Sequence, residues 1–522
     1  MTSVGWVVMR GWLAGLAGWI AVAGAAPAAA AWQEASSPHF LVYSDDDPAE
    51  VTAFATTLER FDKAMRVMRG LPDTPVSAAQ RVTVYVLKDV RAVQRLLGSS
   101  GVAGVYLPRV SGAIAFVPRE THDRGKLALS AQAVLLHEYA HHFMFATWGE
   151  RPFPAWFVEG FAEFNATAIV QPDRILFGAP PLYRAVGMID TDQVPARDLL
   201  LRSPSERKMT PEQRQTFYGR AWLLTHYLTL GRGERETMRG YFDTLDHKTA
   251  AEAAATLGDP RQLDKALNAY ARSKRLPMFG IKLADLPIGA VTVRALGAAE
   301  AAIMPVRQRS QRGVDSRSAR GVVEEARLVA ARFPSDPAVQ VALAEAEYDA
   351  GDYAAADAAA ARALAASPKL GRAMMYRGMA QEALAAADKS TDAARWKTVR
   401  GWFRDANRLD PEDPWPLAAF YQAYARSGEP MSANAEKGLA YAYQLAPFDR
   451  GLAISVAMMH IKHQRRDEAA AALRRVAYDP HGGQTAEWAM TLLTALQSND
   501  PAAIAAMAEA AGAPPAPPPE ER

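Results

Sequence analysis

An H-E-x-x-H motif at residues 137–141 brings together residue types that bind zinc. The apolar pattern of residues 127–147 predicts a helix, in which His137 and His141 lie one turn apart on nearly the same face. This is the separation that two imidazoles need to reach one tetrahedral zinc ion. Glu138 lies about 100° around the helix, where its carboxylate can contact a water molecule on that ion. The spacing therefore predicts a zinc site with a carboxylate beside it.

A catalytic zinc ion needs three protein ligands and one open position for water. The helix predicted over residues 154–167 carries two carboxylates, Glu159 and Glu163. An antiparallel helix pair would return Glu159 to the histidines, so we expect Glu159 to be the third ligand. We expect Glu163 to accept the remaining N–H of a ligand histidine. Two alternatives stay open: the glutamates exchange these roles, or the two helices pack through incidental charges and bind no metal.

The elements around these helices mix strands and helices. Residues 40–43 and 82–87 are runs of β-branched and aromatic residues and predict strands. Between them, residues 47–69 have apolar positions spaced by three or four and predict an amphipathic helix. Residues 105–107 and 113–117 predict a hairpin. The first half of the chain is therefore expected to be an α+β domain.

The C-terminal half has a different pattern, rich in alanine and repetitive. Five prolines, 33 to 43 residues apart, are each expected to follow the end of a helix: Pro334, Pro368, Pro411, Pro447 and Pro480. Their spacing is near the tetratricopeptide period of about 34, and residues 318–511 resemble tetratricopeptide repeats. We expect an all-α solenoid with a concave face for a protein partner. The alternative is a helical lid that packs on the first domain and has no partner.

A polar stretch between the halves is expected to be a linker. Residues 251–317 are predicted to connect the two parts, and residues 306–320 carry five arginines. Each half is accordingly expected to fold without the other. The proline-rich residues 512–522 are expected to form a disordered tail.

The two glutamate- and histidine-bearing motifs together resemble a known family. The H-E-x-x-H motif followed by W-F-V-E-G-F-A-E at residues 156–163 is similar to the gluzincin metallopeptidases, in particular the bacterial peptidase MA-like group that carries tetratricopeptide repeats. The resemblance implies a zincin-like catalytic domain over residues 32–250. It also implies zinc bound by His137, His141 and Glu159, with Glu138 as the general base.

The same resemblance suggests a further catalytic residue, Tyr218. The sequence Tyr-Gly-Arg-Ala at residues 218–221 is similar to a family signature whose tyrosine stabilises the tetrahedral intermediate. Arg220 and Ala221 stand where the family has lysine and glycine. The alternative for Tyr218 is a buried position on a helix predicted over residues 217–228.

The strand before the H-E-x-x-H motif indicates whether cleavage occurs at the end of a substrate chain or within it. Aminopeptidases of this clan carry G-A-M-E-N there, whereas this chain has Gly-Ala-Ile-Ala-Phe at residues 112–116 and lacks the carboxylate that binds the substrate amine. We therefore expect an endopeptidase that hydrolyses peptide bonds of a peptide or protein substrate, with the strand's backbone available for pairing. The competing function is a non-catalytic exported scaffold with a structural or vestigial zinc site.

Composition and the N-terminal residues limit the kinds of site and partner and indicate the cellular compartment. The 522 residues include no cysteine and carry a net charge of +2, which excludes disulfides and thiolate metal sites and argues against a nucleic-acid partner. Arg10, the apolar residues 11–26 and the small residues Ala29 and Ala31 predict a cleavable signal peptide over residues 1–31. We expect a periplasmic or secreted protein, with a retained N-terminal anchor as the alternative.

Overall fold

The computed structural model describes residues 32–100, 102–121, 128–149, 151, 153–189, 194–201, 209–231, 234–479, 483–498 and 502. The expected signal peptide, residues 1–31, and the expected tail, residues 512–522, lie outside the described residues. Within the described part, no helix has the length and apolar character needed to cross a membrane.

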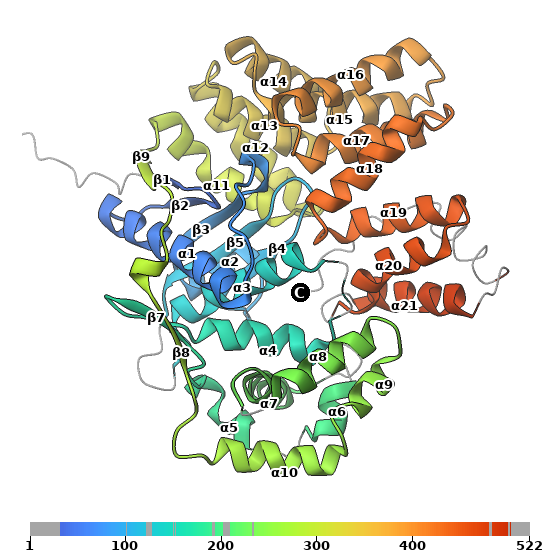
Figure 1. Cartoon of the computed structure of the whole chain (residues 1–522). Coiled ribbons are helices and arrows are strands. Elements are labelled where there is room, and N and C mark those ends of the chain that lie inside the picture. Colours follow the sequence, from blue (N-terminus) through green and yellow to red (C-terminus); the bar gives the residue numbers. More distant parts are fainter. Residues whose placement is uncertain are drawn as a thin grey trace, which may run out of the picture.

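A mixed six-stranded sheet forms the centre of the N-terminal half (Figure 1). Strands β2, β3 and β5 are parallel, and β4, β1 and β9 pair antiparallel at the two sides of this group. The strands are, in spatial order, β4 (Val105–Leu107), β5 (Ile114–Glu120), β3 (Val82–Asp89), β2 (Phe40–Ser44), β1 (Gln33–Ser36) and β9 (Thr292–Ala295). The predicted strands and the predicted hairpin are confirmed.

Four helices cover the two faces of this sheet, α1 (Pro48–Arg69) and α3 (Ala131–Thr147) on one face and α2 (Val90–Leu97) and α11 (Ala298–Arg312) on the other. Side chains of each strand alternate between the two cores. Val84 and Val86 of β3 lie in the core with α1 and α3, whereas Tyr85 and Leu87 lie in the core with α2 and α11. Both faces of the sheet are therefore buried.

Helix α3 begins at Ala131, later than the predicted helix, because the Ser130 side chain caps it by accepting the N–H of Ala133. Helix α4 (Ala155–Ala166) follows after a short turn and packs on α3. Helix α7 (Pro211–Leu230) packs on the other side of α4. These three helices form the layer that carries the predicted site.

Further short elements lie around α4 in Figure 1, the helices mostly below it and a small sheet to its left. The helices are α5 (Ala185–Ile189), α6 (Ala196–Leu201), α8 (Glu234–Leu245), α9 (Ala250–Ala255) and α10 (Pro260–Ala271). A second, three-stranded sheet contains β6 (Ile169–Val170), β7 (Arg174–Phe177) and β8 (Phe279–Lys282). The 3-10 turns η2 (Leu182–Arg184) and η3 (Leu283–Asp285) belong to this part, whereas η1 (Ala78–Gln80) lies between α1 and β3.

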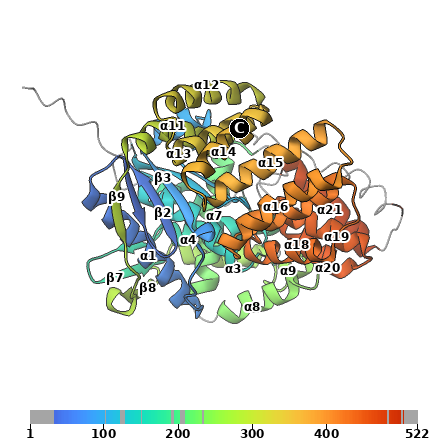
Figure 2. The ribbon, with the colours of Figure 1, turned by 90° about the horizontal axis from the view of Figure 1, so that it is seen from above.

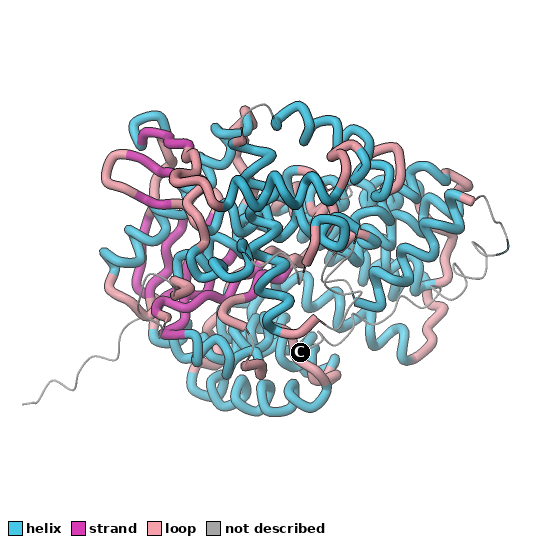
Figure 3. The backbone as a smooth tube through the Cα atoms, turned by 90° about the horizontal axis from the view of Figure 1, so that it is seen from below, coloured by secondary structure: helices cyan, strands magenta, loops and turns pink. Residues whose placement is uncertain are grey.

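The C-terminal half is a helical array in which consecutive helices pack on one another (Figure 2). Its helices are α12 (Ser316–Arg332), α13 (Pro337–Asp349), α14 (Tyr353–Ala366), α15 (Gly371–Ala387), α16 (Ala393–Leu409), α17 (Pro414–Ser427), α18 (Ala433–Leu445), α19 (Arg450–Lys462), α20 (Arg466–Ala477) and α21 (Gly483–Gln497). Pro334, Pro368, Pro411 and Pro447 each follow the end of a helix, as the proline spacing predicts, while Pro480 lies outside the described residues. Strands are confined to one side of the molecule and helices make up the rest (Figure 3).

The expected linker is not a linker. Residues 306–320 belong to α11, α12 and the short turn between them, and Val306 is fully buried. The Arg307 guanidinium lies 4.5 Å from the centre of the Tyr43 ring. The Tyr85 hydroxyl donates to Gln311 Oε1 at 2.6 Å. Sequence composition cannot distinguish an exposed arginine from one that stacks on a buried aromatic ring, which is why the prediction was wrong.

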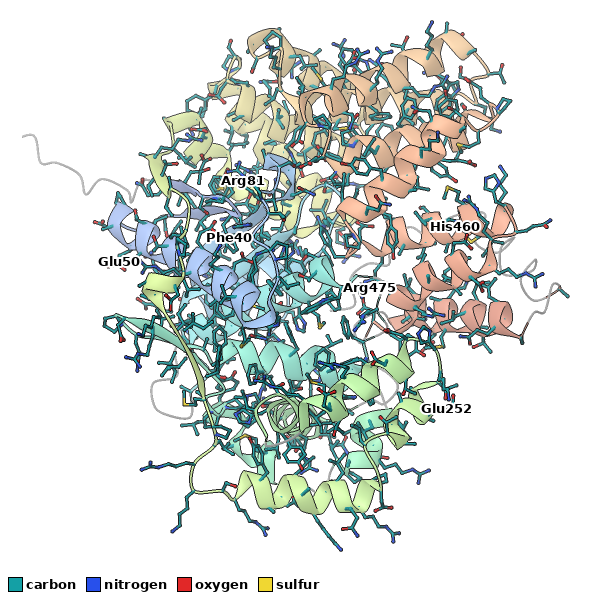
Figure 4. The ribbon with its side chains drawn as sticks, in the orientation of Figure 1. Phe40, Glu50, Arg81, Glu252, His460 and Arg475 are labelled. Carbon is teal, nitrogen blue, oxygen red and sulfur yellow. The ribbon has the colours of Figure 1, made fainter. Side chains whose placement is uncertain are left out.

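The array is joined to the N-terminal half by a shared hydrophobic core. Leu439, Leu452 and Val456 lie in the same cluster of buried residues as the apolar side chains of α3 and α4. The backbone N–H of Val110 donates to Asp449 Oδ2 at 2.7 Å. In Figure 4 the labelled Arg475 extends from α20 toward the N-terminal half, and its guanidinium lies 3.7 Å from the centre of the Phe145 ring of α3. The two halves therefore pack into one continuous structure, whereas we expected a linker to separate them.

Candidate metal centre

His137, His141 and Glu159 converge on one point between α3 and α4. The Nε2 atoms of the two histidines are 3.1 Å apart, and Glu159 Oε2 lies 3.6 Å from that of His137 and 3.8 Å from that of His141. A tetrahedral zinc ion with bonds of about 2.1 Å separates its ligand atoms by about 3.4 Å. Two imidazoles and a carboxylate are also a donor set that zinc accepts at catalytic sites. The three residues therefore fit a zinc ion in both spacing and chemistry.

The position of Glu159 depends on close contact between α4 and α7. A Cβ atom at Gly160 would lie 2.2 Å from Thr225 Oγ1 and 2.4 Å from the carbonyl oxygen of Ala221, so only glycine allows this approach. On the other faces of α4, Trp156 and Phe161 are buried. Glu159 itself is fully buried and must be offset by positive charge, because a buried carboxylate loses its hydration.

Glu163 lies on the other side of the His137 ring. Its Oε1 atom is 3.7 Å from His137 Nδ1, the ring nitrogen that does not face Glu159. The Tyr183 hydroxyl donates to Glu163 Oε2 at 2.8 Å, and Arg184 Nε donates to Oε1 at 3.0 Å. The structure thus places Glu159, and not Glu163, with the two Nε2 atoms. Tyr183 and Arg184 were missed by the sequence analysis because they follow Glu163 by 20 residues or more and carry no motif.

The electrostatics of the site favour a cation. Burial lowers the pKa of His137, but the carboxylates of Glu159, Glu163 and Glu138 outweigh it, so the pKa of His137 is raised above its ordinary value. The same negative potential that stabilises a protonated imidazole attracts a divalent metal ion.

Glu138 is half-buried, next along α3 from His137. A Cβ atom at Gly104, in the loop before β4, would lie 2.5 Å from Val134 Cγ1 and 3.8 Å from Glu138 Cγ. Any larger side chain at position 104 would therefore clash with α3 and crowd Glu138. Gly104 has no signal in the sequence, since a single glycine in a loop is common.

Tyr218 of α7 lies beside His137, with the two ring centres 6.2 Å apart. The Arg184 guanidinium lies 4.8 Å from the centre of the Tyr218 ring. Burial and the charge of Glu159 raise the pKa of Tyr218 well above its ordinary value, so its hydroxyl stays protonated and can donate a hydrogen bond. Arg220 instead points away from the site, where it donates to Asp264 and Asn268 of α10.

A second group with metal-ligand spacing is an ion-pair cluster. His39, Asp62 and Asp73 bring one ligand atom each within 4.8 Å of one another. However, Lys63 Nζ lies 2.6 Å from Asp73 Oδ2, and Arg66 Nε lies 2.7 Å from Asp62 Oδ2. These two cations already neutralise the carboxylates, so the cluster is a poor site for a further cation.

Comparisons with solved structures match less than half of this chain. No family model matches the sequence, and no curated protein matches it. Among solved structures, a thermophilic TPR protein of Thermus thermophilus is 18% identical with a TM-score of 0.31, covering 40% of this chain and 100% of that chain. The MamA RS-1 ArsTM double mutant is 16% identical with a TM-score of 0.27, covering 40% and 99%. Pseudomonas aeruginosa pilF is 17% identical with a TM-score of 0.31, covering 41% and 90%. All three TM-scores are low. We therefore describe the array from the packing of its own helices and not from these structures.

Proposed function

We propose that this protein is a zinc-dependent endopeptidase of the gluzincin type, with a zincin-like N-terminal domain. The observation that carries the proposal is the convergence of His137, His141 and Glu159, with Glu138 next to the first histidine on α3. A purely structural zinc site has no use for the carboxylate of Glu138, whereas hydrolysis needs a proton acceptor there.

Each residue has a distinct part in this proposal. His137, His141 and Glu159 would hold the zinc ion, which when bound supplies Lewis-acid activation of water and of the scissile carbonyl. Glu138 accepts a proton from the attacking water and returns it to the leaving amine. The Tyr218 hydroxyl donates a hydrogen bond to the developing oxyanion. Glu163 orients His137 through Nδ1.

The sheet topology suggests how a substrate chain binds. Strand β5, which we expected to offer its backbone, is paired on both sides, by β3 and β4. The edge strands of the sheet are β4 and β9, and β4 begins immediately after Gly104 and so lies beside Glu138. An extended peptide that adds to the edge of β4 would pass the metal centre. The absence of an amine-binding carboxylate in residues 112–116 favours cleavage within a chain.

The experiment separates metal binding from chemistry. Zinc content and hydrolysis of an unfolded protein are measured for the wild type and for Glu138→Gln, His137→Ala and His141→Ala. We expect Glu138→Gln to bind zinc normally and to hydrolyse nothing measurable, because glutamine keeps the shape but accepts no proton. Each histidine variant should lose zinc and activity together. A wild-type protein that carries stoichiometric zinc and cleaves no peptide would instead favour the non-catalytic scaffold.

Export and a protein partner on the helical array belong to the same proposal. The N-terminal pattern supports a periplasmic or secreted protein, which N-terminal sequencing of the mature chain tests. The array supports a role in holding a substrate or partner, because stacked helix pairs present extended surfaces.

A further inference from the structure

A cavity lies on the face of α4 that points away from the metal centre. Phe157, Phe161 and Phe164 line it, whereas Glu159 and Glu163, each two positions along the helix from a lining phenylalanine, project about 200° around α4. The ends of α1 and α7, helix α8 and strand β8 also line it. Its volume of about 600 Å³ is in the range of small-molecule sites.

Seven aromatic side chains line the cavity. Phe157 and Phe242 pack edge to face with ring centres 4.6 Å apart, and Phe153 lies 5.3 Å from Phe157. Trp148 packs against Phe161 at 6.0 Å. The uncharged polar side chains of the wall are few, chiefly those of two threonines of α7. The cavity can therefore hold an aliphatic chain, but it offers few partners to the amide groups of a peptide.

Arg69 places a guanidinium in this wall that has only uncharged partners among the described residues. Its guanidinium lies 4.6 Å from the centre of the Phe161 ring and donates to the carbonyl oxygen of Met65 at 2.9 Å and to Asn165 Oδ1 at 3.2 Å. Both acceptors are uncharged, and no carboxylate in the described part of the chain forms an ion pair with Arg69. Burial lowers the pKa of Arg69 to about 9, which leaves it cationic near neutral pH.

The other charges of the lining do not cancel this one. Arg151 pairs with Asp246 at 3.2 Å and Arg239 with Glu236 at 3.2 Å, so both are already neutralised. Arg235 donates to the carbonyl oxygen of Thr229 and adds a further positive charge, and Asp243 is the one acidic side chain among the lining residues that the structure describes. A ligand that brings one anionic group would supply the charge that Arg69 lacks.

We propose that this cavity binds a long-chain carboxylate, with its head group on Arg69 and its aliphatic chain among the aromatic rings. The proposal does not depend on the proposed peptidase function, because the two sites use opposite faces of α4. It predicts a preference for an anionic head group over a neutral one of equal chain length.

The test uses the full chain and the fluorescent fatty acid cis-parinaric acid, displaced by palmitate or by hexadecanol. We expect palmitate to displace the probe at a concentration at least about tenfold lower than hexadecanol does, because only its carboxylate forms a charge-assisted hydrogen bond with Arg69. Arg69→Gln should remove this difference. Arg239→Gln is the matched control, because Arg239 is 69% exposed and already paired, and it should keep the preference.

A cavity-filling variant tests the location of the site. Met238 lines the cavity, and Met238→Trp should abolish displacement by both ligands while circular dichroism shows an unchanged helix content. Equal competition by palmitate and hexadecanol, binding that survives Met238→Trp, or no binding of the probe would each overturn the proposal. If Arg69→Gln does not fold, two other variants still test the proposal. These are Arg69→Lys, which keeps the charge, and Met238→Trp.

Discussion

Tyr218 lies beside the candidate metal centre with its hydroxyl protonated, so it can donate a hydrogen bond to an oxyanion. If its hydroxyl acts on the reacting carbonyl, Tyr218→Phe removes one hydrogen bond and leaves the ligands in place. We expect kcat to fall by about 10² to 10³ with little change in zinc content or in unfolding temperature. Steady-state kinetics and metal analysis of the variant check this. Full turnover would assign Tyr218 to packing against His137 alone.

His39 illustrates a buried titratable residue with a structural effect. Its Nδ1 lies 2.8 Å from Glu59 Oε2, and its backbone N–H donates to Glu59 Oε1 at 2.8 Å. Burial lowers the pKa of His39, but the hydrogen bond to Glu59 and the charges of Asp62 and Glu59 outweigh it, so the pKa is raised from 6.5. Asp73 Oδ1 also faces the ring, 3.4 Å from Nε2, while Lys63 and Arg66 bind the neighbouring carboxylates.

This raised pKa predicts a pH dependence of stability. A histidine whose pKa is higher in the folded state stabilises the fold fully below pH 6.5, and the effect is lost as pH rises through the folded value. Glu59 has a lowered pKa, so its contribution is present above pH 4.5 and is lost at lower pH. The difference in unfolding temperature between wild type and His39→Gln should therefore be largest between pH 4.5 and pH 6.5 and shrink as pH rises through the folded-state pKa of His39. A difference that is constant with pH would contradict it.

At the scale of elements, the contact between α4 and α7 determines where Glu159 lies. Gly160→Ala would push the new Cβ atom into Thr225 and Ala221, so the helices must separate. We expect the free energy of unfolding to fall by about 1 to 3 kcal/mol and zinc affinity to fall with it. Urea unfolding and zinc titration measure both.

A glycine with open space provides the control for this variant. Gly321 of α12 has no heavy atom within 4 Å of an added Cβ. Gly321→Ala should raise the free energy of unfolding by up to about 1 kcal/mol, because alanine is the better helix former, and should leave zinc binding unchanged. If the two substitutions had equal effects on zinc affinity, the separation of α4 from α7 would not displace Glu159.

At the scale of the whole molecule, the array packs directly on the helix that carries both histidines. The Phe448 ring lies 5.6 Å from that of His142, next to His141. Asp449 both caps α19, by accepting the N–H of Leu452, and accepts the N–H of Val110. The array therefore buttresses α3 in addition to any partner that it binds.

Phe448→Ala tests this coupling in the full chain. We expect lower stability and a weaker zinc affinity, because the substitution opens a cavity behind α3. Phe420→Ala is the matched control, since Phe420 packs within a core of the array that excludes α3. It should lower stability and leave zinc affinity unchanged. Unchanged zinc affinity in Phe448→Ala would show that α3 keeps its position without the array.

The sequence by itself determined the features that depend on local spacing. Two histidines four residues apart on a helix meet whatever lies around them, and prolines after helix ends mark the period of the array. Runs of β-branched and aromatic residues likewise located β2 and β3, whereas β1 and β9 were not predicted. Even the return of Glu159 to the histidines required only a short turn between two helices, so a local argument reached it.

Only the tertiary structure decided which distant segments meet. Tyr183, Arg184 and Gly104 join the site from segments with no motif, and the arginine-rich residues 306–320 turn out to be helices that stack on the sheet. Asp449 reaches Val110 across more than three hundred residues. Helix and strand periodicity arises from contacts between near neighbours in the chain, whereas such long-range contacts depend on packing of whole surfaces and leave no periodic pattern in either segment.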